Sequence, residues 1–367
     1  MHVGMSTFFQ NLAGGTDAEV YRHELSMADR AEALGFDSVW SAEHHFTGYT
    51  MCPNVMQFLT WVAARTSRVQ LGSMSVITPW HDPVRIAEEV AVLDQMSQGR
   101  VLLGLGRGLG QVEFNGFRLD MGESRQRFVE YTEALLQGLN TGHMAYDGQL
   151  YQQPPIDIRP APYASFEGRV YASAVSPESA RIMARLGIGV MIIAQKPWDK
   201  TVAELEEYRA IYREVHGCEA PKPIVACFVC CDKDAAAADD LHQRYARAYC
   251  QSALDHYEFA NEGLAAINGY EYYGALAKNI ARHGKAAFID FLADLQVRGT
   301  PDAVFERLVD YRDKVDAGGF IAIFSFGGMP SALAHRNMDT FAQHVLPRLK
   351  ALDAGARGIC SVPRAAA

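Results

Sequence analysis

Short apolar runs alternate with amphipathic segments along almost the whole chain, and this alternation predicts parallel βαβ units. The runs predicted as buried strands are 3–9, 36–40, 69–77, 101–105, 170–173, 190–193, 224–230 and 320–324. The segments predicted as helices are 17–34, a stretch that starts near 53, 83–98, 123–139, 177–186, 198–215, 301–317 and 331–352. Eight strand–helix pairs indicate a closed barrel rather than an open sheet, so the predicted fold is an α/β fold, a (β/α)8 TIM barrel.

Three stretches do not follow the alternation. Residues 104–122 are rich in glycine and are predicted to form a loop and an irregular connection, and residues 144–151 have the pattern of a β-hairpin. The segment 235–296 is too long for one crossover helix, and its aromatic side chains and glycines fit either a lid over the barrel mouth or a structural helical elaboration. We predict one domain over 1–352, with the insertion at about 235–296, and a flexible tail at 353–367.

Composition and charge narrow the class of protein. The chain has 367 residues, of which 49% are apolar and 21% charged, and this is typical of a soluble globular protein. The net charge of -9, without a basic run, argues against a nucleic-acid or anionic-membrane partner. We expect no signal peptide and no membrane span, and the odd count of 7 cysteines fits a reducing compartment, which favours a cytoplasmic location. Cys227 and Cys230 lie on opposite faces of a predicted strand, so no metal site is predicted.

The first candidate for chemistry is the stretch Ser41-Ala42-Glu43-His44-His45-Phe46, which follows the predicted strand 36–40. In an α/β barrel the carboxyl ends of the strands carry the active site. Adjacent histidines in a turn point to different sides, so one can face a pocket while Glu43 holds the other. The pair is either an ordinary set of hydrogen-bonded loop histidines or a catalytic group, and the features below favour a catalytic His44.

Three further features fall at predicted strand ends on the same face. The glycine-rich run 104–110 lets a planar or polyanionic ligand approach the backbone, and Arg107 supplies a forked donor for a phosphate. It is not a dinucleotide fingerprint, because Leu109 occupies the third glycine position and no helix is predicted to start there. The small residues of 72–77 leave room for a flat ring, although this pattern alone is also typical of simple packing.

The third feature is a serine-rich turn at 173–179. Ser176 is a natural cap for a helix that begins at Pro177, and the free amides at this end form a cradle for a phosphate, or simply an ordinary capped helix. Glu178 would repel a phosphate unless its side chain points outward. A phosphate donor and a phosphate cradle in the same barrel mouth together favour a mononucleotide ligand.

These motifs carry a resemblance to a known family. The turn Glu43-His44-His45-Phe46-Thr47, the helix over 83–100 and Arg107-Gly108-Leu109 resemble the bacterial luciferase-like flavin monooxygenases, especially the luciferase alpha chain. The later segments 176–181 and 326–330 are similar to the wider family. The resemblance covers roughly residues 1 to 350, and its most specific part is the first 130.

The resemblance implies a barrel that binds reduced FMN at the carboxyl ends of its strands. It makes His44 the acid/base group beside the flavin ring, with Glu43 next to it, and it places a non-proline cis peptide under the ring, here between Met74 and Ser75. The full set of cofactor-binding residues that it implies is Arg107, Gly108, Leu109, Met74, Ser75, Arg125, Ser173, Ala174, Ser176 and Ser179. Gly106 stands where the luciferase alpha chain has a cysteine facing the flavin, which favours a monooxygenation without light.

The expected activity is that of a two-component monooxygenase. Because no nicotinamide site is visible, a separate NAD(P)H:flavin reductase is expected to supply reduced FMN, and oxygen would form a flavin C4a-hydroperoxide that acts on a small organic substrate. Two alternatives stay open: a deazaflavin-dependent hydride transfer and a non-catalytic flavin-binding partner subunit, although the presence of His44 and Arg107 argues against the second. An unrelated phosphate-dependent lyase or isomerase would need a lysine or paired carboxylates at strand ends, and no convincing set is found. A homodimer is expected, with a heterodimer as the alternative.

Overall fold

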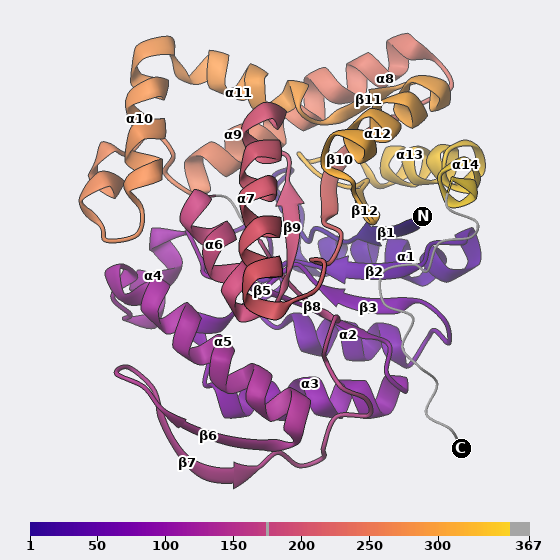
Figure 1. The fold of residues 1–367 in the computed structure, drawn as a ribbon. Helices are drawn as coiled ribbons and strands as arrows, with labels where there is room; N and C mark the ends of the chain where they lie inside the picture. The colour runs from indigo at the N-terminus through magenta and orange to yellow at the C-terminus, as the bar shows by residue number, and fades with distance from the viewer. Residues whose placement is uncertain (174–175, 353–367) are drawn as a thin grey trace.

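Eight parallel strands form a closed barrel, which confirms the predicted fold class (Figure 1). The computed structural model describes residues 1–173 and 176–352. The barrel strands, in spatial order, are β1 (His2–Ser6), β2 (Ser38–Ser41), β3 (Gln70–Ser73), β5 (Val101–Gly106), β8 (Val170–Ser173), β9 (Gly189–Ile193), β10 (Ile224–Cys231) and β12 (Gly319–Ile323). Pairing of β12 with both β10 and β1 closes the ring.

The outer helices follow the sequence signals closely. They are α1 (Asp17–Leu34), α2 (Val55–Ala63), α3 (Pro83–Ser97), α5 (Ser124–Thr141), α6 (Pro177–Leu186), α7 (Trp198–His216), α12 (Pro301–Val315), α13 (Ser331–His344) and α14 (Leu346–Ala351). Thr16 and Glu19 form a capping box at the start of α1, and the Asp82 side chain caps α3. None of the helices in the described ranges combines the length and hydrophobicity that a bilayer-spanning segment needs.

Three predicted elements differ in the structure. The strand predicted over 69–77 is divided into β3 and β4 (Val76–Ile77) at the cis peptide between Met74 and Ser75. The helix predicted over 331–352 is divided into α13 and α14, because Pro347 has no amide to continue the hydrogen-bond ladder. The prediction that no helix follows the glycine-rich run is wrong, since α4 (Gln111–Phe117) begins directly after Gly110 and a 3₁₀ turn (Met121–Glu123) follows it.

The interior of the barrel is closely packed. Trp40 on β2 is fully buried, and its indole nitrogen donates to Ser38 Oγ at 2.7 Å. A Cβ atom at Gly72 of β3 would lie 2.1 Å from the Trp40 ring, so only glycine fits beside it. Gly104 of β5 is similar, since a Cβ there would lie 1.9 Å from the Ser73 carbonyl oxygen. Gly104 therefore serves strand packing rather than the approach of a ligand.

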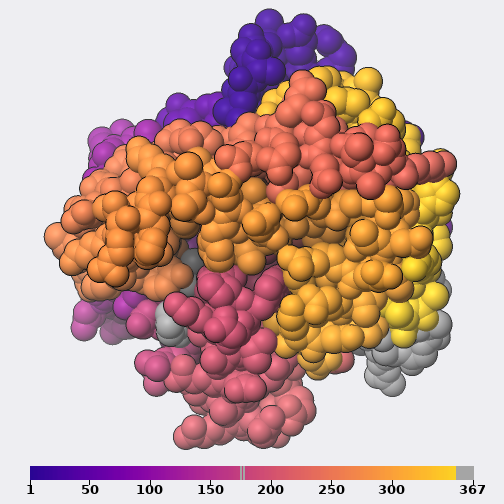
Figure 2. All heavy atoms as spheres, turned by 90° about the horizontal axis from the view of Figure 1, so that it is seen from above, coloured from indigo at the N-terminus to yellow at the C-terminus, as the bar shows by residue number. Residues whose placement is uncertain are grey.

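The insertion folds over the carboxyl ends of the strands. It consists of α8 (Ala235–Leu241), a π-helical turn (His242–Ala246), α9 (Arg247–His256), a 3₁₀ turn (Glu262–Ala266), α10 (Glu271–His283) and α11 (Lys285–Asp294), and it is followed by β11 (Val297–Gly299). Figures 1 and 2 show these helices spread across one face of the molecule. The predicted hairpin is confirmed as β6 (His143–Asp147) and β7 (Gln152–Asp157), and Figure 1 places it at the opposite end from α10 and α11. The predicted tail 353–367 lies outside the described residues.

A buried carboxyl group on α1 makes the stability depend on pH. Glu24 is 2% exposed and accepts a hydrogen bond from the Phe8 amide at 3.0 Å. Burial raises the pKa of this carboxyl to about 7, against the opposing effect of hydrogen bonds from Ser325 and Phe8. The folded state therefore binds the proton more tightly than the unfolded chain. The resulting stabilisation is fully present below the ordinary pKa of 4.5 and is lost as the pH rises through about 7.

We expect Glu24→Gln to remove this dependence, because the amide is neutral at every pH. The free energy of unfolding, measured by urea denaturation, should be higher for the variant than for the wild type by up to about 3 kcal/mol at alkaline pH. At acid pH the two values should differ little. Glu88→Gln, at an exposed carboxylate of α3, is the control and should change neither value. An equal pH dependence in Glu24→Gln and wild type would contradict the assignment.

Candidate active site

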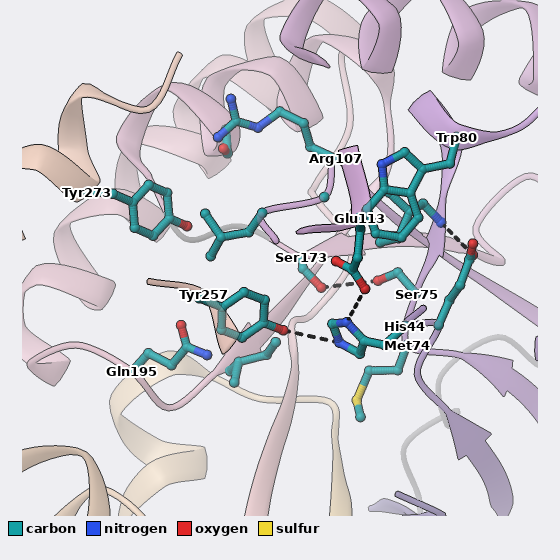
Figure 3. Close-up of a pocket in the computed structure, with 17 residues that line it drawn as sticks. His44, Met74, Ser75, Trp80, Arg107, Glu113, Ser173, Gln195, Tyr257 and Tyr273 are labelled. Atoms are coloured by element: carbon teal, nitrogen blue, oxygen red, sulfur yellow. Dashed lines mark hydrogen bonds and ion pairs between the residues drawn. The ribbon is translucent and has the colours of Figure 1, made fainter. Parts of the chain in front are cut away.

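A cavity of about 760 Å³, measured out to its open mouth, lies between the strand ends and the insertion (Figure 3). The structure brings most of the sequence-predicted residues into its wall, namely Glu43, His44, Met74, Ser75, Arg107, Gly108, Leu109, Ser173 and Ser179. Ser176 is the buried cap of α6, and its hydroxyl oxygen lies 2.9 Å from that of Ser179. Arg125 does not line the cavity, and Ala174 lies outside the described residues.

The two histidines point in different directions, as the sequence predicts. His44 lines the cavity, whereas His45 Nε2 lies 3.0 Å from Glu43 Oε1. The same carboxylate contacts His81 and accepts from the Ile77 amide at 2.9 Å. Burial by itself would raise the pKa of Glu43, but the hydrogen bonds from His45 and His81 outweigh it and lower that pKa. Both oxygens of Glu43 are therefore used to hold the loop and not to contact His44.

The carboxylate that contacts His44 is Glu113 on α4, a residue that the sequence reasoning missed. His44 Nδ1 lies 2.9 Å from Glu113 Oε1, and the Glu113 side chain is 0% exposed. Burial alone would raise the pKa of Glu113, but its interactions with the neighbouring imidazoles of His44 and His256 outweigh burial and lower that pKa to about 2. An acid in the first turn after Gly110 was the available signal, since carboxylates are favoured at helix amino ends. This signal is missed because residues 104–122 are predicted to form an irregular connection without a helix.

The insertion adds further residues that were not predicted individually. Tyr257 and Tyr273 line the cavity, and the Tyr257 hydroxyl lies 3.1 Å from His44 Nε2. The ligand atoms of His44, Glu113 and His256 all lie within 4.8 Å of one another. The 2.9 Å separation of His44 Nδ1 and Glu113 Oε1 is also hydrogen-bond distance. We interpret this contact as a hydrogen bond of the site.

One end of the cavity has the donors that a phosphate group requires. The Ser179 amide donates to Ser176 Oγ at 3.3 Å, and the two hydroxyl oxygens are 2.9 Å apart. Ser75 Oγ and Ser173 Oγ are 3.2 Å apart at the end of β8. The Glu178 side chain is exposed, which satisfies the condition that it point outward. The hydroxyl groups and the α6 amino terminus therefore fit an anionic group of phosphate type.

Arg107 is held at the cavity wall by the insertion. Its Nη1 donates to the Gly269 carbonyl at 2.8 Å, and its guanidinium carbon lies 4.1 Å from the centre of the Tyr270 ring. Arg125 Nη2 donates to the same carbonyl at 3.1 Å. The guanidinium of Arg107 has five N–H donors, so this contact leaves donors for a ligand.

The other end of the cavity suits a flat ring. The Met74–Ser75 peptide is cis, as the resemblance implies, and Ile77, Trp80 and Leu109 add apolar surface. A Cβ atom at Gly106 would lie 2.6 Å from Ile77 Cδ1 and 3.2 Å from Ser75 Cβ. A cysteine at this position would therefore need movement of Ile77. A flat apolar surface next to a phosphate site fits a flavin-type cofactor.

Comparison with known proteins decides the family. Residues 1–317 match the model described as luciferase-like monooxygenase. The chain belongs to this family. The alkanal monooxygenase alpha chain of Photobacterium leiognathi is 26% identical over 361 residues, which cover 95% of this chain and 99% of that protein. The luciferase-like family consists of flavin-dependent monooxygenases and related oxidoreductases, so the chain is an enzyme of this class.

Solved structures of luciferase-like enzymes agree with this assignment. The monooxygenase RslO1 from Streptomyces bottropensis superposes with a TM-score of 0.78 and 26% identity, covering 95% of this chain and 100% of that one. The oxygenating constituent of 3,6-diketocamphane monooxygenase from Pseudomonas putida, in complex with FMN, has a TM-score of 0.73 at 17% identity, covering 95% and 98%. An F420-dependent secondary alcohol dehydrogenase has a TM-score of 0.68 at 14% identity, covering 94% and 98%. The last two show likeness of fold alone.

Proposed function

We propose that the chain is the oxygenating component of a two-component monooxygenase. It binds reduced FMN delivered by a separate NAD(P)H:flavin reductase and uses molecular oxygen to oxygenate a small organic substrate. The observation that carries this proposal is the His44 imidazole, paired with the buried Glu113, in the same cavity as Arg107 and the serine-rich end of α6. This cavity combines a proton-transfer group, a flat surface for the flavin ring and a phosphate site.

The residues that would hold FMN divide into two groups. Met74, Ser75, Gly108 and Leu109 would contact the ring, while Arg107, Ser173, Ala174, Ser176 and Ser179 would hold the phosphate. Arg125 would act through Arg107, because both guanidinium groups donate to the Gly269 carbonyl. The bound reduced flavin supplies the reaction with oxygen.

The protein supplies proton transfer and shielding. A histidine is suited to both giving and accepting a proton near neutral pH. Glu113 orients the His44 ring through Nδ1, which leaves Nε2 as the atom that holds or moves a proton at the cavity. Glu43 positions the loop by holding His45, and the apolar side chains of Ile77, Trp80 and Leu109 exclude water from the ring site.

The lining of the cavity toward the insertion supports a neutral substrate. Ile193, Gln195, Tyr257 and Tyr273 form this side. A narrow crevice beside the cavity shares Ile193 and Gln195 with it. Its described lining is uncharged, and consists of Ile193, Ala194, Gln195, Phe228, Tyr249, Cys250, Ala253, Phe259, Leu292 and Gln296. A compact apolar molecule with one polar group near the Gln195 amide fits this surface best.

Anaerobic titration with reduced FMN, followed by rapid mixing with aerated buffer, tests the function. We expect saturable binding of reduced FMN and oxygen consumption that depends on the protein. Tight binding of a reduced deazaflavin, with turnover that consumes no oxygen, would instead establish the deazaflavin-dependent alternative. Binding of reduced FMN without any oxygen chemistry would identify a non-catalytic flavin-binding subunit. Sedimentation of the isolated chain distinguishes the expected homodimer from a chain that needs a different partner.

Arg107→Ala should weaken FMN binding without stopping the reaction of the bound cofactor. Loss of one charge-assisted pair costs ~1.5–3 kcal/mol, which corresponds to roughly a 10- to 100-fold higher Kd. The rate at saturating reduced FMN should stay within about threefold of the wild type, since Arg107 is not placed at the reacting ring. Arg85→Ala on the exposed face of α3 is the control. An unchanged Kd in Arg107→Ala would remove Arg107 from the phosphate site.

A further inference from the structure

The insertion reaches the His44–Glu113 pair through two consecutive residues at the carboxyl end of α9. The Tyr257 hydroxyl lies 3.1 Å from His44 Nε2, and Figure 3 shows it pointing at the imidazole from the insertion side. The preceding residue, His256, places its Nε2 3.8 Å from Glu113 Oε2, the carboxylate oxygen that His44 does not use. One short segment of the insertion therefore contacts both members of the pair.

Two buried polar atoms face each other across the space between His256 and Glu113. Glu113 Oε2 and His256 Nε2 both lack a hydrogen bond within the described part of the chain. Their side chains are 0% and 3% exposed, so water does not reach them from the surface. An unpaired buried group costs about 1–3 kcal/mol, so pairing of these two atoms would stabilise the folded state. Burial lowers the pKa of His256, which keeps the ring neutral near neutral pH.

Thr47 contacts Nδ1 of His256, the ring nitrogen that does not face Glu113. The Tyr49 amide donates to Thr47 Oγ1 at 3.3 Å, and the same oxygen lies 3.3 Å from His256 Nδ1. A carboxylate can only accept a hydrogen bond, so a neutral imidazole whose Nε2 faces Glu113 carries its proton there. Its Nδ1 is then an acceptor, and the Thr47 hydroxyl can donate to it. The Tyr49 ring stacks on His256 with centres 4.3 Å apart at 9°, which keeps the imidazole in this plane.

The same reasoning shows which ring nitrogen of His44 carries a proton. An ionised carboxylate can only accept, so the contact with Glu113 requires a proton on His44 Nδ1. Burial raises the pKa of Tyr257 well above its ordinary range, so its hydroxyl stays protonated and can donate. In neutral His44 the remaining lone pair, on Nε2, accepts from that hydroxyl.

We propose that Thr47, His256, Glu113, His44 and Tyr257 form one directional hydrogen-bond network, through which the insertion holds His44 as the Nδ1–H tautomer and covers its Nε2 with the Tyr257 hydroxyl. His256 and Tyr257 are then positioning residues of the proton-transfer group, and this inference rests on the proposed function of His44. The insertion accordingly does more than cover the cavity. It determines the tautomer of the His44 imidazole, which transfers a proton in the proposed reaction.

Nitrogen-15 spectra of histidine-labelled, cofactor-free protein test the network, because protonated and unprotonated ring nitrogens have different shifts. His44→Gln and His256→Gln assign the signals among the 12 histidines. We expect protonated Nδ1 in His44 and protonated Nε2 in His256. Tyr257→Phe should shift the His44 Nε2 signal, because the hydroxyl that donates to it is removed. Thr47→Val, which keeps the side-chain shape, should shift the His256 Nδ1 signal.

Single-turnover rates with reduced FMN and oxygen provide a second measurement. Tyr257→Phe and His256→Ala should each slow the reaction roughly 10-fold, with the Kd for FMN within about twofold of the wild type. The control variants are Tyr272→Phe and His283→Ala on α10, which lie outside the cavity wall and should react at the wild-type rate.

The outcomes separate the two proposals. If the spectra show the expected tautomers but the wild type consumes no oxygen with reduced FMN, the proposed function is wrong and the network stands. If oxygen is consumed but Tyr257→Phe and Thr47→Val leave the His44 and His256 shifts unchanged, the network is overturned. A major Nε2–H tautomer of His44 in the wild type would also overturn it.

Discussion

His44→Ala should lower turnover by ~10²–10⁴ while leaving the affinity for FMN largely intact, as expected for loss of a general acid or base. The side chain contacts Glu113 and Tyr257 and faces the cavity, and it is not among the residues proposed to hold the phosphate. The effect should therefore appear in the rate at saturating reduced FMN and not in the Kd. Stopped-flow mixing of the reduced complex with oxygenated buffer, with substrate present, measures both quantities.

Two further measurements make the His44 result specific. The variant leaves a space beside the Glu113 carboxylate, so added imidazole should restore part of the lost turnover. His143→Ala, at an exposed histidine of the β6–β7 hairpin, should behave as wild type. Full activity in His44→Ala would show that another group transfers the proton.

Arg169→Met should cost ~3–5 kcal/mol in the free energy of unfolding, because it leaves the Asp94 carboxylate buried without its partner. The two side chains are 2% and 0% exposed, with Arg169 Nη1 2.7 Å from Asp94 Oδ1 and Nη2 3.1 Å from Oδ2. Arg169 also donates to the carbonyls of Gly99, Val101 and Ala164. The pair thus joins the end of α3 to the segment that leads into β8.

Urea denaturation monitored by circular dichroism measures this cost. Arg181→Ala breaks an exposed ion pair with Glu207, whose members are 48% and 40% exposed, and should cost at most about 1 kcal/mol. The double variant Asp94→Leu with Arg169→Met should be less destabilised than Arg169→Met alone, since no unpaired charge is then left inside. A cost for Arg169→Met equal to that of Arg181→Ala would contradict the role of the buried pair.

Local signals in the sequence account for much of the barrel. The helix bounds Asp17–Leu34 and Pro177–Leu186 are predicted to the residue, because Thr16 and Ser176 are caps and glycines follow both helices. The wrong prediction of an irregular stretch at α4 has an equally local cause. A glycine at its amino terminus gives no side-chain cap, so the helix Gln111–Phe117 lacks the usual start signal.

The sequence by itself determined the barrel, the family and the residues at the strand ends, because alternation, caps and strand-end motifs act over a few neighbouring positions. It could not show that the carboxylate beside His44 is Glu113, or that His256 and Tyr257 reach the same imidazole. These residues are 69, 212 and 213 positions away from it in the chain. Only the closure of the barrel and the folding of the insertion across its mouth bring them together, since tertiary packing decides contacts between distant segments.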